Sequence, residues 1–180
     1  QAGDGLIRLQ FNDRKTSREK ECKGAKMQTL NYSIEIRAPK EKVWWSMLGK
    51  DGYRKWKAVF DPGSHYTGTW EEGSKMKFLN RNGDGMVSEV VANKLFELVS
   101  VMHYRSIKGG IEQDGEPDPD RYPAFEDYEF IETNGITRVR VSVDSPDDYV
   151  NMMEDLFPKA LQKLKRMCEV RIAHHAHQNQ

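Results

Sequence analysis

The stretch that decides the fold is residues 145–172, SPDDYVNMMEDLFPKALQKLKRMCEVRI, near the end of the chain. Its apolar residues recur at steps of three and four, the period of an amphipathic helix; they are Tyr149, Met153, Leu156, Phe157, Ala160, Leu161, Leu164, Met167 and Cys168. Ser145 is a good N-cap, Pro146 suits the first helical position, and the two aspartates that follow complement the helix dipole. The pattern predicts one long helix, on the order of 40 Å, that lies with its apolar face on a sheet.

Pro158 is the irregular residue of this predicted helix. Because proline lacks a backbone N–H and its ring crowds the preceding turn, it is expected to kink the helix or to split it into two pieces. A bent helix would enclose space that a straight helix fills.

The sheet is predicted upstream, where apolar and polar residues alternate as they do in half-buried strands. Seven strands are predicted, at 30–37, 64–71, 75–79, 86–93, 96–105, 124–132 and 136–144, with two short helices at 39–48 and 51–57 between the first and the second strand. Asn134-Gly135 joins the last two strands and is a strong hairpin signal. The expected fold is α+β: a seven-stranded, curved, mostly antiparallel sheet wrapped on the C-terminal helix.

Composition narrows the classes of partner. The chain has 180 residues, with 28 basic and 28 acidic side chains and a pI near 7.1. It therefore has no global attraction for nucleic acid or an anionic membrane. Cys22 and Cys168 form no disulfide framework, and no apolar run is long enough for a signal peptide or a membrane span. A cytoplasmic protein is expected, without a nucleic-acid or membrane partner.

The same patterns divide the chain into three parts. Residues 1–26 are charged and poor in pattern, and they are expected to be a flexible extension. Residues 27–172 form the single domain, and 173–180 a flexible tail.

Several stretches carry a resemblance to a known superfamily. They are 36–45 (IRAPKEKVWW), 70–78 (WEEGSKMKF), 85–91 (GMVSEVV) and 158–165 (PKALQKLK). With the order of elements, they resemble the helix-grip fold of the START and polyketide-cyclase (SRPBCC) superfamily, in its branch related to the activator of the heat-shock-protein ATPase. These motifs are mostly structural and indicate the fold better than the activity.

The resemblance implies a cavity between the sheet and the long helix that takes an apolar or amphipathic small molecule, such as a lipid or a polyketide. The sequence is compatible with this, because it offers many aromatic side chains and adaptable methionines. The residues predicted to line the cavity are Trp56, Tyr66, Trp70, Phe78, His103, Glu126, Tyr128 and Met153. The alternative is that these side chains simply pack on one another as core.

Strand parity selects the polar members of this set. Glu126 shares a face with Tyr128 and Phe130, so it is expected inside the cavity or at its rim. If His103 also points inward, it could meet Glu126 and form a polar anchor that binds a hydroxyl or carbonyl, or moves a proton. A structural hydrogen-bonded pair, or no contact at all, is the alternative.

Other signals are weak. His174, His175 and His177 could bind a metal but lie in the predicted tail, and no nucleotide loop, calcium loop or known catalytic motif is present. No cofactor or metal is expected, and a binding protein is favoured over an enzyme.

Two alternative functions stay open. The first is a cyclase or aromatase that uses Glu126 and His103, with Tyr66 or Tyr128 orienting the substrate. The second is a co-chaperone-like module that acts on a heat-shock ATPase. A homodimer is possible.

Overall fold

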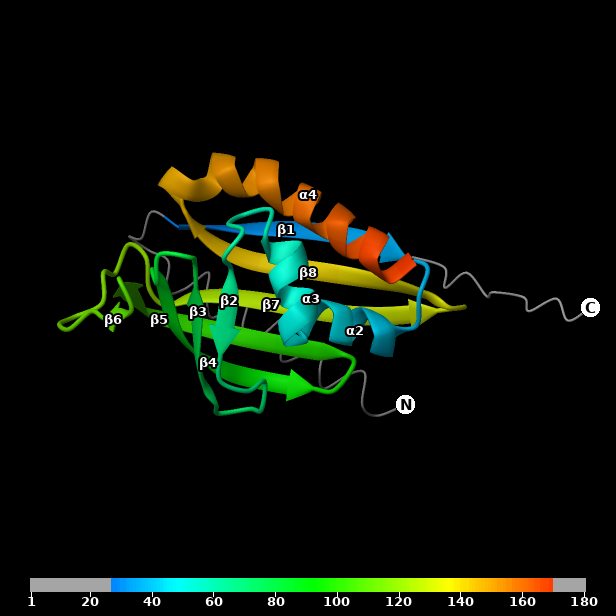
Figure 1. Ribbon diagram of the computed structural model, residues 1–180, viewed down its shortest axis with the longest axis horizontal. Coiled ribbons are helices and arrows are strands. Elements are labelled where there is room, and N and C mark those ends of the chain that lie inside the picture. The colour runs from blue at the N-terminus through cyan, green and yellow to red at the C-terminus, as the bar shows by residue number, and fades with distance from the viewer. Residues whose placement is uncertain (1–26, 170–180) are drawn as a thin grey trace, which may run out of the picture.

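The computed structural model describes residues 27–169, which form one antiparallel sheet with helices packed on it (Figure 1). The predicted extension 1–26, the tail 173–180 and residues 170–172 of the predicted helix lie outside the described residues.

The strands pair in an order that places the first beside the last. They are β1 (Met27–Ile36), β2 (His65–Thr67), β3 (Lys75–Leu79), β4 (Gly85–Lys94), β5 (Leu98–Lys108), β6 (Ile111–Glu112), β7 (Ala124–Thr133) and β8 (Ile136–Pro146). The sheet order is β1-β8-β7-β5-β4-β3-β2, and β6 pairs with β5. All pairings are antiparallel. The seven predicted strands are present, and the two-residue β6 adds an eighth between the predicted strands 96–105 and 124–132.

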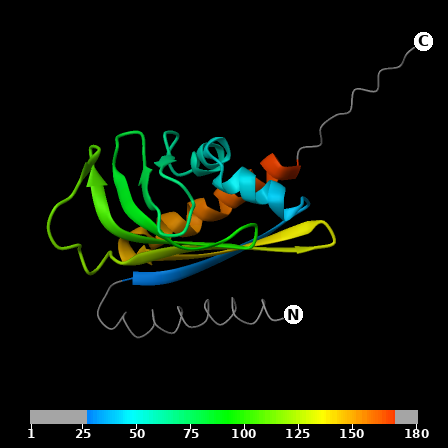
Figure 2. The same cartoon turned by 90° about the horizontal axis from the view of Figure 1, so that it is seen from below.

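The helices lie on the side toward which the sheet curves (Figure 2). They are α2 (Lys40–Leu48), α3 (Lys50–Lys57), the 3-10 turn η1 (Asp147–Tyr149) and α4 (Val150–Glu169). α4 runs along β1 and β8, while α2 and α3 cross the middle of the sheet (Figure 1). The core lies between these layers, with Trp44, Trp56 and Phe157 among its largest fully buried side chains. This arrangement confirms the predicted helix-grip α+β fold.

The start of α4 differs from the prediction. Ser145 is no N-cap, because it belongs to β8 and pairs with Gln28 of β1, while Pro146 pairs with Met27. The residues predicted to begin the helix therefore form the end of β8, because their backbone pairs with β1. Tyr149, predicted on the apolar stripe, lies in η1 and is 44% exposed.

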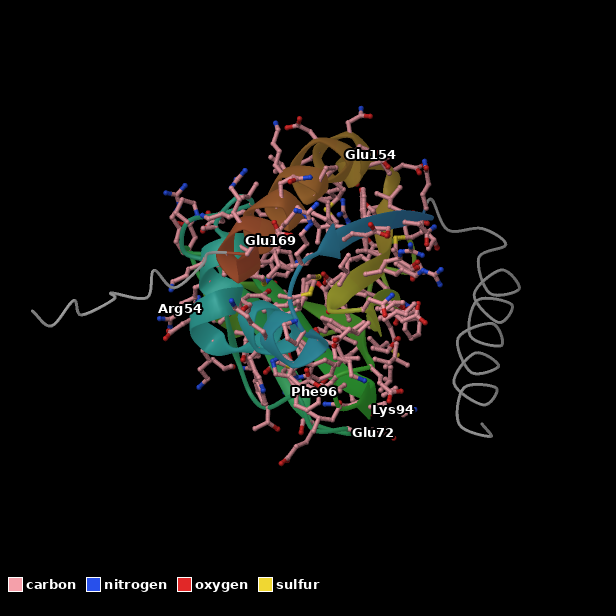
Figure 3. All side chains as sticks on the ribbon, turned by 90° about the vertical axis from the view of Figure 1, so that its right-hand side faces the viewer. Arg54, Glu72, Lys94, Phe96, Glu154 and Glu169 are labelled. Atoms are coloured by element: carbon pink, nitrogen blue, oxygen red, sulfur yellow. The ribbon has the colours of Figure 1, made fainter. Side chains whose placement is uncertain are left out.

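The helix is continuous through Pro158, so of the two predicted outcomes, a kink or a split into two pieces, the split is wrong. Pro158 is exposed, and so is Glu154, whose carbonyl would have accepted the missing hydrogen bond. Water can satisfy that carbonyl on the outer side, which makes proline tolerable there. Figure 3 labels Glu154, in the early part of α4, and Glu169, the last residue of α4.

Two turns show where strands end. Asn134 and Gly135 both have positive φ, at 51° and 74°, as the predicted tight hairpin requires. β2 ends at Thr67, four residues before the predicted end, because Gly68 adopts φ 101° and turns the chain out of the sheet.

Candidate functional site

Five polar side chains meet in the aromatic interior near the end of α3. Lys57 Nζ lies 2.9 Å from Glu126 Oε1, and the Tyr128 hydroxyl donates to the same carboxylate. His103 Nε2 lies 3.4 Å from Glu126 Oε2, and His103 Nδ1 lies 2.6 Å from Ser88 Oγ. We call Lys57, Ser88, His103, Glu126 and Tyr128 the polar cluster. Glu126 is its centre.

Sheet register brings four members of the polar cluster together. Glu126 and Tyr128 are two residues apart on β7, so their side chains lie on one face. His103 on β5 is diagonal to Glu126, since Val101 pairs with Glu126. Ser88 on β4 pairs directly with His103. Lys57, the last residue of α3, reaches the cluster from the helical layer.

Burial differs across the cluster. Ser88, His103 and Tyr128 are buried, while the side chains of Lys57 and Glu126 are each 13% exposed. The ion pair is therefore the part of the cluster that meets solvent.

Aromatic rings surround the ammonium group of Lys57. Its Nζ lies 4.7 Å from the centroid of the Trp56 ring, 5.1 Å from that of Phe60 and 5.2 Å from that of Phe157. Such contacts attract a cation electrostatically, and more strongly where water is displaced. Lys57 is thus a charged group in a mostly apolar setting.

The cluster shifts the pKa of two of its members. Burial by itself raises the pKa of Glu126, but the charge of Lys57 and the contacts with His103 and Tyr128 outweigh it, so the pKa lies well below its ordinary value. Burial, together with the neighbouring Glu126, holds the pKa of Tyr128 well above its ordinary value. At neutral pH Glu126 is an ionised acceptor and Tyr128 a donor.

The lowered pKa of Glu126 predicts acid sensitivity. Because the folded pKa lies below the unfolded one, the charge of Glu126 stabilises the fold above the unfolded pKa of roughly 4.3, and this contribution is lost as pH falls toward the folded value. Below roughly pH 4 we expect the native chain to lose up to about 1.4 kcal/mol per pH unit more than Glu126→Gln. Urea unfolding at a series of pH values measures this, and equal slopes for the two proteins would contradict the assignment.

The residues predicted to line the cavity fall into two groups that Phe78 connects. Its ring lies 5.7 Å from the imidazole of His103, 6.2 Å from Tyr66 and 5.8 Å from Trp70. Trp56 lies edge-on to Tyr128, at 6.4 Å. The structure thus connects the predicted aromatic residues to the polar cluster by ring contacts.

Three of these residues use their polar atoms within the fold. The Tyr66 hydroxyl and the Trp70 indole both donate to the carbonyl of Leu48, at 2.6 and 2.9 Å. The Trp56 indole donates to Met47 at 2.8 Å. The bonds from Tyr66 and Trp70 hold the end of α2 against β2 and the turn that follows it, and the bond from Trp56 joins α3 to α2.

Met153, on α4, is half-buried and packs against the hydrophobic core. It is not among the residues described in contact with the polar cluster. Lys57 and Ser88 belong to the cluster but were not predicted. Lys57 carries a usable signal, since the aromatic residues Tyr53 and Phe60 lie four residues before it and three residues after it. Ser88 carries none, because the strand register shifts between Val87 and Ser88.

Within residues 27–169, no group of three or more His, Cys, Asp or Glu side chains is arranged to hold a metal ion. His174, His175 and His177 lie outside the described residues. No helix in the described part of the chain is long and apolar enough to cross a membrane.

Comparison with known proteins identifies the fold. No family model matches the chain. No curated protein sequence matches it either. Solved structures do match, among them the solution structure of the Aha1 dimer from Colwellia psychrerythraea, with 20% identity and a TM-score of 0.61 over 79% of this chain and 97% of that one. CalU16 from Micromonospora echinospora matches with 12% identity and a TM-score of 0.55, over 79% and 77%.

A third match is DynU16, a protein of the dynemicin biosynthetic locus, with 14% identity and a TM-score of 0.57 over 79% of this chain. The match spans only 47% of the length of DynU16. At these identities the comparisons establish the architecture: the chain has the helix-grip fold of these proteins, and the Aha1 branch that its sequence resembles is among them.

Proposed function

We propose that this domain binds an apolar or amphipathic small molecule, such as a lipid or a polyketide, between the sheet and α4. The observation that carries the proposal is the Lys57–Glu126 ion pair, which is surrounded by aromatic rings yet remains 13% exposed on each side chain. The pair would anchor a hydroxyl or carbonyl of the ligand, and the rings of Trp56, Phe78 and Tyr128 would contact its apolar body.

Stability alone is a poor explanation for such a pair. Removing two charges from water costs several kcal/mol per ion, and apolar residues of similar volume often stabilise a fold equally well or better. A charged pair is instead useful where a partner must be oriented. DynU16, a protein of the dynemicin biosynthetic locus, has the same fold, and this supports including polyketides among the ligands tested.

A thermal-shift screen tests the proposal directly. A bound ligand at a hundred times its dissociation constant adds about 2.7 kcal/mol, which for a domain of this size raises the Tm by roughly 5–10 °C. We expect at least one member of a panel of fatty acids, sterols and aromatic polyketides to do so. The variant Lys57→Met should lose that shift, whereas Lys159→Met, which removes an exposed lysine paired with Asp155, should keep it. A panel without any shift would contradict the proposal.

The contact between His103 and Glu126 supports a second candidate, an enzyme of the cyclase or aromatase kind. Its weakness is the lowered pKa of Glu126, which makes the carboxylate a poor proton acceptor at neutral pH. Tyr66 is also a poor orienting group, since its hydroxyl is bound to Leu48. Conversion of a poly-β-ketone thioester by the native chain, lost in Glu126→Gln, would favour this candidate.

The remaining expectations stay predictions. A homodimer is supported by the Aha1 structure, which was solved as a dimer, and sedimentation would test it. The cytoplasmic location and the co-chaperone-like alternative rest on the sequence and its resemblance.

A further inference from the structure

Tyr32 on β1 carries a hydroxyl without a protein partner. Within residues 27–169, it is the one buried side-chain oxygen or nitrogen that makes no hydrogen bond. The ring is fixed by stacking on Phe157 of α4, with centroids 4.7 Å apart and the planes inclined by 7°. The Tyr32 side chain as a whole is half-buried, its hydroxyl oxygen is buried, and its ring packs against α4.

An unpaired hydroxyl is costly to keep. A buried donor without an acceptor costs about 1–3 kcal/mol, and each such group in a native fold needs a specific explanation. Phenylalanine would make the same stacking contact without this cost. The fold therefore does not explain the oxygen of Tyr32.

Tyr32 and the polar cluster share a neighbour. The Phe157 ring that stacks on Tyr32 also lies 5.2 Å from Lys57 Nζ, and Phe60 packs edge-on against it at 5.5 Å. The Tyr32 hydroxyl and the Lys57–Glu126 pair thus flank one aromatic wall, the first at β1 and the second at the end of α3.

The hydroxyl acts as a donor at any physiological pH. Burial, with the nearby charge of Glu154, raises the pKa of Tyr32 to about 12. A ligand atom opposite it must therefore be able to accept a hydrogen bond, as a ketone or quinone oxygen does.

We propose that Tyr32 contacts the ligand of this domain and donates a hydrogen bond to a carbonyl oxygen, while the Lys57–Glu126 pair holds a second polar group. This inference rests on the proposed function and narrows the ligand class. The ligand is a rigid, mostly apolar molecule with oxygen at two separated positions, such as a polycyclic aromatic ketone. A fatty acid, with one polar end, cannot use both anchors.

The test compares Tyr32→Phe with the native chain by fluorescence titration and calorimetry. Two probes are used: emodin, a hydroxylated anthraquinone, and oleic acid. Loss of one hydrogen bond should weaken emodin binding about tenfold, equivalent to about 1.4 kcal/mol, and leave any oleic acid binding unchanged. The Tm of the ligand-free variant should be equal to or above that of the native chain, because no protein contact is lost. The control Tyr149→Phe removes an exposed hydroxyl and should change neither affinity.

Each other outcome overturns the inference. Equal emodin affinity in Tyr32→Phe would show that the hydroxyl does not contact the ligand. A Tm several degrees lower without ligand would assign it a structural partner. Binding of oleic acid but not emodin would refute the proposed ligand class, while the proposed binding function would remain. Binding of neither probe, together with no Tm shift from any member of the thermal-shift panel, would refute both the ligand class and the binding function.

Discussion

Replacing Glu126 with alanine is expected to lower the free energy of unfolding by about 3–5 kcal/mol, as removal of one partner of a buried ion pair does. Three groups depend on this carboxylate: Lys57, Tyr128 and His103. The variant leaves the ammonium of Lys57 unpaired among aromatic rings, and it leaves the buried Tyr128 hydroxyl without its acceptor. Urea unfolding at neutral pH measures the loss.

A double-mutant cycle separates the pair from the rest of the cluster. Glu126→Leu combined with Lys57→Met leaves neither charge unpaired, so it should cost less than the sum of the single changes, with a coupling energy of about 1–3 kcal/mol. The matched control is the surface pair Asp155–Lys159, in which both side chains are 61% exposed. Its coupling should be less than about 0.5 kcal/mol. Similar coupling in the two pairs would mean that the Glu126 pair is effectively solvated.

Phe157→Ala is expected to cost about 3–5 kcal/mol, the usual range for truncating a buried phenylalanine. The side chain is fully buried where α4 meets β1 and α3, between the ring of Tyr32 and those of Trp56 and Phe60. Its removal leaves a cavity and frees the Tyr32 ring from its stacking partner. Thermal unfolding followed by circular dichroism gives the magnitude.

A second substitution at Phe157 and one at an exposed residue of the same helix provide controls for this prediction. Phe157→Leu keeps most of the apolar volume and should lose distinctly less stability than the alanine variant. Met152→Ala truncates a side chain that is 42% exposed and should stay within about 0.5 kcal/mol of the native chain. If Phe157→Ala behaved like Met152→Ala, α4 would not be held to the sheet at this point.

The fold was predictable because, over most of the chain, the turn and helix signals of single residues agree with the apolar pattern of the strands and helices around them. Alternation predicted β7 and β8, and the Asn134-Gly135 dipeptide predicted the turn that joins them. The strong apolar stripe predicted α4 as the helix that covers the sheet. Where these signals failed, at Ser145 and Pro146, pairing with a strand more than a hundred residues away decided the outcome.

The candidate site was predictable only in part. Strand parity placed Glu126 on the inner face of β7 and left His103 undetermined, and the structure brings the two together. Lys57 was missed because a lysine at the end of a basic helix is ordinarily solvated, and only its aromatic neighbours at helical spacing indicate otherwise. The role proposed for Tyr32 depends on the absence of a partner, which no sequence pattern reveals.

The pairing of β1 with β8 also constrains how the protein is made. While the chain is being synthesised, β1 is made well before β8 and α4, so Ile36 and Trp56 would face water until those two elements are available. Contacts between residues so distant along the chain slow folding, and they prolong the time for which aggregation-prone intermediates expose apolar surface. A chain that lacks β8 and α4 therefore exposes apolar residues that the complete fold buries.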